Sequence, residues 1–483
     1  MAKDNQVERG STGLAVKAGA WYVASTFLLK SIAFITIPIF SRLLSKSDYG
    51  EFGNYANWQA MLVILTGAEL YNSLSRAYYD YKEDYDRFVS SVTMLTFFFT
   101  AAFYVLFLLS GSWIYRVVKI PPQFVHILFF TLFCSACKTL FMARERTLYR
   151  YKSVAAISAI DTVIPTAIAV VLVMLAPESS RLGARIYGFY LPSAMVGLFC
   201  AGLMLLRGRT FKAEHCKYAL MLSIPLLLHY LTISLLTSTN TIITKNIGGA
   251  ELSAEVSMAT SVLHILTMLF TSLSGALTTW LMDNLEQKQE DKVRRESLVY
   301  LLGLAVVSIG VILIAPEVLA ILGGSQYASA VVLIPGMVFA AFLQTVTTIF
   351  TIILTYDKNV VKTAVFSGIM AVASVAAKVF LFPYYGVMCL PAVNIVVCAA
   401  LFFINYLLVC RAGYRRAIDL RKYALATGFV LLFMVFSAFL YSHNIIRWTL
   451  ILIGIAGLLV VTCLFRDKLR TALKKNKKQK ADA

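Results

Sequence analysis

Long apolar runs dominate the chain and limit what it can fold into. The runs are roughly 18–25 residues long, and short polar links separate them. A helix of about 20 apolar residues spans the hydrocarbon core of a bilayer. Only 14% of the 483 residues are charged, whereas a soluble protein carries about 25%. The sequence therefore predicts an all-α, polytopic membrane protein without a sizeable soluble domain.

We predict fourteen transmembrane segments, and this even number places both termini on one side of the membrane. The first segment is too long for a cleavable signal, and no cleavage site follows it. The predicted segments are 18–40, 53–75, 88–110, 121–143, 153–176, 186–206, 218–244, 254–281, 298–315, 328–355, 362–382, 386–410, 422–441 and 446–464.

The basic residues predict which side of the membrane is the cytoplasm. Of the 44 lysines and arginines, 33 lie in the two termini and the even-numbered links, and eight lie in the opposite links. Cytoplasmic links are enriched in lysine and arginine, so both termini are expected in the cytoplasm. The same bias explains the net charge of +19 and argues against a nucleic-acid partner. We expect the basic tail to contact anionic membrane lipids or to be disordered.

Polar side chains form stripes along the second, seventh, eighth and tenth predicted helices, and the stripe on the second runs from Gln59 to Arg76. In the eighth segment seven polar residues alternate at spacings of three and four, which places them on one face of a helix. Ser and Thr also stabilise dry helix contacts in membranes. Stripes this long are more typical of a water-filled cavity, so we predict a central hydrophilic cavity. The candidate lining residues are Lys30, Gln59, Glu69, Arg76, Tyr230, His264, Thr267, Thr271 and Gln344.

Ionisable residues within the apolar runs are candidates for anion binding or ion coupling. Lys30 lies at the middle of the first segment, where a lysine facing lipid costs several kcal/mol. It is expected either to bind an anion in the cavity or to pair with Glu69 or Asp161. These two carboxylates are also the candidates for coupling to a proton or sodium gradient, and pairing with a lysine is the alternative for Asp161. Lys138 and Lys378 lie nearer the ends of their segments and are expected to snorkel towards the surface.

A metal or redox site is not expected from the cysteines. Cys134 and Cys137 form a CxxC pattern, but the pattern lies inside an apolar run without further ligands nearby. Most of the other cysteines also lie in apolar runs, where cysteine behaves as a small hydrophobic residue. We therefore predict no metal and no cofactor.

The stretch PIFSRLLSKSDYGEFGNY resembles the start of the polysaccharide transporters of the MOP superfamily. In that family a first helix ends in Pro and is followed by an Arg-Leu-Leu link and an Asp-Tyr-Gly turn. The matching residues here are Pro38, Arg42, Leu43, Leu44, Asp48, Tyr49 and Gly50. The size of the chain, its fourteen segments and its short outer links extend the resemblance to the whole chain.

The resemblance implies a Wzx-type flippase of the bacterial inner membrane. Such a protein moves undecaprenyl-pyrophosphate-linked oligosaccharide units outwards by alternating access, for O-antigen, capsule or exopolysaccharide synthesis. It has two six-helix lobes around a cavity lined chiefly by segments one, two, seven and eight, and two further helices. The implied divisions are 1–210 for the N-terminal lobe, 211–415 for the C-terminal lobe, 416–466 for the last two helices and 467–483 for the tail.

Other functions are also consistent with parts of the sequence. A lipid II flippase or a teichoic or teichuronic unit exporter would use nearly the same chemistry. A multidrug exporter of the same superfamily would use Glu69 and Asp161 to attract cations, whereas Lys30 argues against it. An enzyme of polysaccharide assembly would need a larger outer domain. The chain has no GxxxxGK[ST] motif for ATP, and its expected partners are a lipid-linked oligosaccharide, membrane lipids and polysaccharide polymerase machinery.

Overall fold

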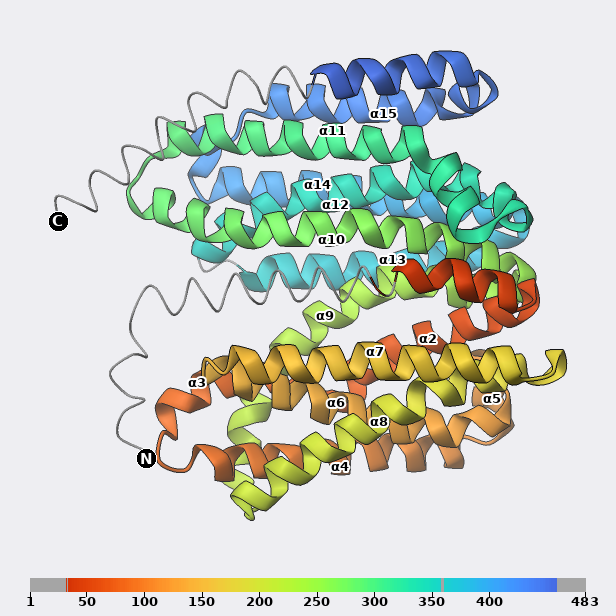
Figure 1. Cartoon of the computed structure of the whole chain (residues 1–483). Coiled ribbons are helices and arrows are strands. Elements are labelled where there is room, and N and C mark those ends of the chain that lie inside the picture. Colours follow the sequence, from red (N-terminus) through yellow and green to blue (C-terminus); the bar gives the residue numbers. More distant parts are fainter. Residues whose placement is uncertain (1–31, 33, 358–359, 458–483) are drawn as a thin grey trace, which may run out of the picture.

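The structure contains helices and short links but no strand in the part of the chain that it describes, which is residues 32, 34–357 and 360–457. In this computed structural model the long helices run roughly parallel to one another (Figure 1). Among the described residues, nine helical stretches are long and apolar enough to cross a membrane, and the stretch Lys362–Arg411 contains two helices. The chain is therefore an all-α, multi-pass membrane protein, as the apolar runs predict. Each of the fourteen predicted segments overlaps a helix over its described residues, although the helix bounds differ and the second segment contains a break.

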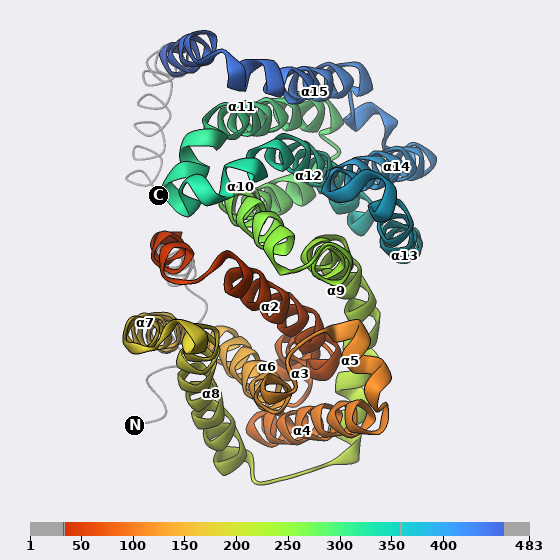
Figure 2. The same cartoon turned by 90° about the vertical axis from the view of Figure 1, so that its right-hand side faces the viewer.

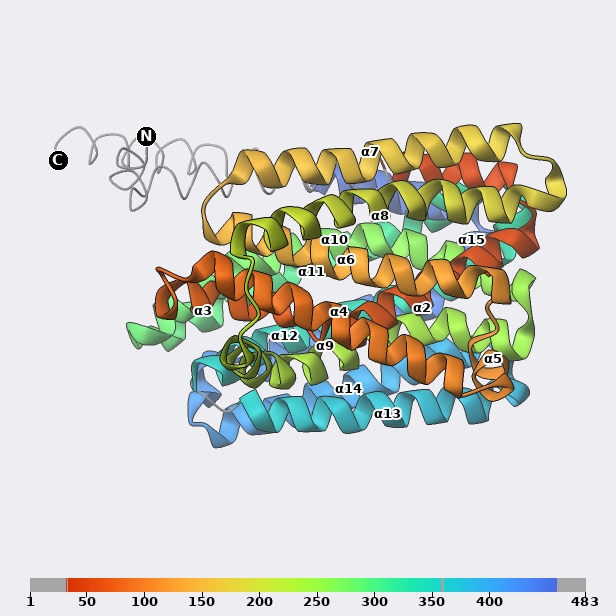
Figure 3. The ribbon, with the colours of Figure 1, turned by 90° about the horizontal axis from the view of Figure 1, so that it is seen from below.

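The helices before residue 209 form one group, with α7 at the opposite edge of the molecule from α13 (Figure 3). The α7 helix is largely exposed at the surface of the helices, because only 17% of its most apolar window is buried. The helices of this group are Phe34–Leu43, α2 (Lys46–Gly67), η1 (Leu70–Asn72), α3 (Ser73–Asp80), α4 (Tyr85–Leu109), α5 (Ser112–Val118), η2 (Pro122–Phe124), α6 (Val125–Thr147), α7 (Tyr151–Leu175), η3 (Glu178–Ser180) and α8 (Arg181–Gly208).

The helices after residue 212 form the second group, with α12 at its centre. In α12 and the short helix before it, 78% of the most apolar window is buried. The helices of this group are α9 (Ala213–Gly248), α10 (Ala250–Glu286), α11 (Glu290–Gly323), η4 (Ser325–Val332), α12 (Leu333–Tyr356), α13 (Val360–Tyr385), η5 (Gly386–Met388), α14 (Cys389–Arg411), η6 (Tyr414–Ala417), α15 (Leu420–Ser442) and the helix Asn444–Gly457. The exact divisions between lobes remain a prediction.

The second predicted segment is not one continuous helix. Its helix α2 begins at Lys46, and the Ser45 side chain caps it by accepting a hydrogen bond from the backbone N–H of Asp48 at 3.0 Å. It then ends at Ala68 and Glu69, which both have left-handed backbone angles, with φ values of 45° and 53°. Such angles are unfavourable for residues other than glycine. The stripe predicted to run from Gln59 to Arg76 is therefore interrupted at Glu69.

The two groups meet tightly where α2 packs against both α9 and α10, as the end-on view shows (Figure 2). We call this the outer end, because the charge bias predicts it to face away from the cytoplasm; that orientation remains a prediction. Lys46 of α2 pairs with Glu255 of α10 at 2.5 Å, and Glu51 of α2 pairs with Lys245 of α9. These four residues, together with Gly50, form what we call the outer seal.

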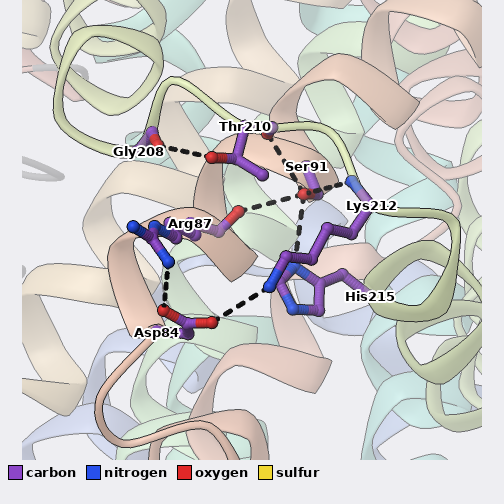
Figure 4. Close-up of polar contacts among 7 residues, drawn as sticks. All are labelled: Asp84, Arg87, Ser91, Gly208, Thr210, Lys212 and His215. Carbon is purple, nitrogen blue, oxygen red and sulfur yellow. Dashed lines mark hydrogen bonds and ion pairs between the residues drawn. The ribbon is translucent and has the colours of Figure 1, made fainter.

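At the opposite, inner end, the beginning of α9 is attached to the first group. The hydroxyl of Ser91 on α4 accepts a hydrogen bond from the backbone N–H of Lys212 at 3.1 Å, and it lies 3.2 Å from Nδ1 of the buried His215 (Figure 4). The Lys212 ammonium binds Asp84 at 3.0 Å. Farther along, α9 packs on α13 and α10 of the second group. The α9 helix is therefore anchored in both groups.

Candidate functional site

A central pocket of about 570 Å³ lies between the first group of helices and α10. Its lining includes Arg146 in the last turn of α6, Arg185 in the first turns of α8, and a single carboxylate, Asp161. Its remaining lining is mixed, with hydroxyls on α7 and aromatic rings on α2 and α8. These residues are Thr36, Ile37, Phe40, Tyr49, Phe52, Met142, Ser158, Thr162, Thr166, Phe189 and Ser261.

Arg185 is the most unusual group in the central pocket. Its side chain is 9% exposed, and its guanidinium carbon lies 3.4 Å from the ring centre of Phe40 and 4.5 Å from that of Phe52. Its Nε and Nη1 atoms have no hydrogen-bond partner among the described residues. A buried charge without a carboxylate partner is costly. The cation–π contacts offset part of this cost, and the two unpaired nitrogens are buried beneath this packing.

Asp161 is held by a lysine from another helix. The Lys138 ammonium of α6 donates to both Asp161 oxygens, at 2.7 and 2.6 Å, and to the Ser193 hydroxyl at 2.9 Å. Ser193 in turn donates to Asp161 at 2.7 Å. The expectation that Lys138 snorkels to the surface is therefore wrong, because a carboxylate within reach satisfies its charge. Because Asp161 is paired with Lys138, the charges of Arg146 and Arg185 give the central pocket a net positive charge.

A second pocket, of about 450 Å³, lies within the second group, between α9, α10, α12 and α14. It gathers three of the predicted cavity residues, namely His264, Thr267 and Gln344. Further members of the predicted stripes also line it. These are Thr237, Thr260 and Thr348. The stripes on the seventh, eighth and tenth segments therefore converge, although α2 contributes no residue to this pocket.

Many of the stripe hydroxyls bind their own helices. Thr260 donates to the carbonyl of Val256 at 2.7 Å, and Thr348 donates to the carbonyl of Gln344 at 3.1 Å. Such bonds satisfy a hydroxyl without a partner helix. The amide oxygens of Asn240 and Asn394, in contrast, are buried without a hydrogen-bond partner among the described residues, and both residues line the second pocket. These amides are the free polar groups of this site.

Glu69 and Tyr230 belong to one hydrogen-bonded chain that joins the two groups of helices. Tyr71 of η1 hydrogen-bonds to the side chains of both Glu69 and Tyr230. Asn72 also donates to a Glu69 carboxylate oxygen at 3.1 Å. Glu69 is 8% exposed, and no ion pair joins it to a residue that the structure describes. Its role in ion coupling remains a prediction.

The other candidate residues lie apart from both pockets. The Gln59 amide is 3.5 Å from the Ser135 hydroxyl, so it faces α6. Arg76 is at the inner surface, where its side chain is 71% exposed and pairs with Asp80 at 3.1 Å. Lys30 and the side chain of Thr271 lie outside the described residues.

Lys378 is fully buried, so the expectation that it snorkels outwards is wrong. Its ammonium donates to the Leu236 carbonyl of α9 at 3.2 Å and lies 3.5 Å from the Thr239 hydroxyl. Both partners are neutral. The cysteines of the CxxC pattern are buried and free, and no cluster of metal-binding side chains occurs in the described ranges.

Sequence reasoning missed Arg185, Asn240 and Asn394. Arg185 fell in an outer link because the predicted sixth segment began at residue 186, whereas α8 begins at Arg181. Asn240 follows Thr237 by three residues, so the stripe on the seventh segment contained the signal for it. Asn394 is an isolated amide in an apolar run, and no local pattern marks it.

The comparisons with known proteins concern both sequence and fold. Residues 15–282, more than half of the chain, match a family described as "Polysaccharide biosynthesis protein". No curated protein matches the chain in sequence.

Several membrane transporters share the fold. The lipid II flippase MurJ in an inward closed conformation is 13% identical, with a TM-score of 0.66, and covers 92% of this chain and 99% of its own. An inward-facing multidrug resistance MATE family transporter of the MOP superfamily is 14% identical, with a TM-score of 0.57 and coverages of 80% and 95%. A MOP superfamily transporter from Pyrococcus furiosus is 14% identical, with a TM-score of 0.51 and coverages of 83% and 99%. At such identities the likeness concerns the fold alone.

Proposed function

Because this chain belongs to the polysaccharide biosynthesis protein family, we propose that it is a flippase for a lipid-linked saccharide. The proposed substrate is an undecaprenyl-pyrophosphate-linked oligosaccharide, as in Wzx-type flippases of the bacterial inner membrane. A pyrophosphate and several sugars must cross about 30 Å of hydrocarbon. A polar cavity replaces the lost hydration, while the prenyl chain stays in lipid. Rocking of the two groups of helices about the central pocket would expose it to each side in turn.

The observation that carries this proposal is the unpaired guanidinium of Arg185 in the central pocket. Its fork of N–H donors suits two phosphate oxygens. Arg146 adds a second cation to the same pocket, and Asp161 is already paired with Lys138. The pocket therefore favours an anionic headgroup over a cationic drug. Lys30, if it reaches the same cavity, would add a further positive charge.

The second pocket suits the sugars. Its histidine, glutamine, threonine and asparagine side chains offer uncharged donors and acceptors, which match the hydroxyls of an oligosaccharide. The free amide oxygens of Asn240 and Asn394 would accept hydrogen bonds from such hydroxyls. Coupling to a proton or sodium gradient through Glu69 or Asp161 is part of the proposal, as is a polymerase as the recipient of the product.

The test is a flipping assay in proteoliposomes with a fluorescent polyprenyl-pyrophosphate-linked saccharide. We expect Arg185→Gln to lower the flipping rate by at least tenfold and Arg185→Lys to retain part of it, because the charge persists. Arg181→Gln is the matched control, since Arg181 lies one turn earlier on α8 and outside both pockets. Normal flipping by Arg185→Gln would overturn the role of this residue. Transport of cationic dyes without any flipping of the saccharide would favour a multidrug exporter.

A further inference from the structure

Five basic side chains without an ion-pair partner surround an open hollow at the inner end of the second group. The hollow has a volume of about 1160 Å³ and lies between the α10–α11 link and the connection from α14 to α15. No ion pair joins these five side chains to any residue in the described ranges. They are Lys288, Lys292, Arg415, Arg416 and Arg421.

The carboxylates of the hollow do not neutralise these cations. Asp419 is already bound by Arg294 at 2.8 Å and by Lys422 at 3.6 Å. The hydrogen bond from Arg294 also lowers the pKa of Asp419. Glu290 and Asp291 lie in the first turn of α11, where the helix dipole favours negative charge. The hollow therefore keeps an excess of positive charge.

The inner surface of the first group provides a contrast. There Arg144 pairs with Asp86 at 2.6 Å, and Arg87 and Lys212 share Asp84 at 2.9 and 3.0 Å. Carboxylates are thus placed opposite several cations on one side of the molecule. In the hollow, five cations converge without such partners, which indicates a site for an external anion.

An apolar stripe on α15 leads from the membrane to the hollow. Leu425, Phe429 and Leu432 follow Arg421 at spacings of four, four and three residues, which places all four on one face of the helix. The three apolar side chains are 73%, 54% and 49% exposed. Acyl chains would cover this face, and Arg421 at its end lines the hollow. A molecule with an apolar tail and an anionic head fits both features.

We propose that the hollow binds the headgroup phosphate of an anionic phospholipid of the adjacent leaflet. Arginine binds phosphate through paired N–H donors, and lysine adds point charges. The excess positive charge would disfavour the ammonium of a zwitterionic headgroup. A free phosphate shares the chemistry of the phospholipid head but lacks the contact with the stripe on α15. This site is separate from the central pocket.

The test measures lipid binding to the full-length protein in neutral detergent. Short-chain phosphatidylglycerol and phosphatidylcholine of equal chain length are titrated, and the shift in thermal unfolding gives the apparent affinity. We expect phosphatidylglycerol to bind more tightly, and Arg415→Gln with Arg416→Gln to weaken it by about 30-fold, or about fivefold for each charge lost near an anionic surface. The matched control is Arg207→Gln with Arg209→Gln, two exposed basic residues at the inner end of α8.

Three outcomes would overturn the proposal. They are equal affinity for the two lipids, an equal loss in the control, and stabilisation by inorganic phosphate alone that matches the effect of phosphatidylglycerol. The last would assign the hollow to a soluble phosphate instead. If the Arg415 and Arg416 variant does not fold, Lys288→Gln with Lys292→Gln removes two charges from the link on the other side of the hollow and decides the question in the same way.

Discussion

Replacement of Gly50 by alanine should open the outer seal. A Cβ atom at Gly50 would lie 1.8 Å from the backbone oxygen of Ala250 and 3.1 Å from the backbone nitrogen of Ala254, whereas ordinary contacts are 3.4–4 Å. The backbone cannot rotate away as a side chain can, and α2 also packs against α9. Overpacking of this kind costs about 1–3 kcal/mol. Separation of the two groups at the outer end would relieve the clash, so the equilibrium should shift towards an outward-open state by about 5- to 150-fold.

The assay is a distance measurement between spin labels at Glu178 and Ser325, which are exposed at the outer ends of the first and second groups. Gly50→Ala should lengthen this distance. Gly53→Ala should lengthen it less, because its clash, at 2.3 Å, is with the Ser257 hydroxyl, which can rotate. Gly303→Ala is the matched control, since its Cβ would meet nothing within 4 Å. An unchanged distance in Gly50→Ala at normal abundance would refute the reasoning.

Three further predictions follow from ion pairs and from the inner attachment of α9. Lys46→Glu should favour the outward-open state by up to about fivefold, and Lys46→Glu with Glu255→Lys should restore the original label distance. If the double change does not restore it, this ion pair does not stabilise the outer seal. Lys138→Met should lower abundance, since it leaves Asp161 unpaired at a cost of about 3–5 kcal/mol, and Lys138→Met with Asp161→Asn should recover it on a membrane blot. Burial and the nearby Lys212 lower the pKa of His215, so its stabilising contribution is complete above about pH 6.5 and is lost as the pH falls. Hydrogen exchange of residues 208–216, corrected for intrinsic rate, should therefore accelerate at low pH, and His215→Gln should reduce that acceleration.

The apolar runs were sufficient to predict the helices, because only helices satisfy the backbone within lipid. They could not predict the left-handed turn at Ala68 and Glu69, since neither residue is a glycine, although Gly67 immediately precedes them. Periodicity showed which hydroxyls share a face of α10, but not which helices that face would meet. The second pocket brings residues from the stripes on α9, α10 and α12 together within the second group. The stripe on α2 was expected to line the same cavity, but α2 contributes no residue to that pocket.

The charged groups were harder to interpret because their partners are far away in the sequence. Lys138 and Asp161 are 23 residues apart and meet through the packing of α6 on α7. Arg185 was missed only because the predicted sixth segment began five residues too late. With the observed start of α8, the residue is a buried cation in a helix and not part of a link. This error is slightly larger than the uncertainty of about two to four residues that is ordinary for helix boundaries, so ionisable residues just outside a predicted segment belong among the candidates for a cavity.

The attachment of α9 to both groups of helices limits how this protein can be recombined with a relative. A chimera joined at residue 210 would separate Lys212 and His215 from Asp84 and Ser91, and would remove Ala219 from the core formed with Phe88 and Cys200. A junction beyond residue 220 would keep this packing with its original partners. A chimera therefore needs the first turns of α9 from the same parent as the N-terminal group, so its junction lies later in the chain than the link between the two groups.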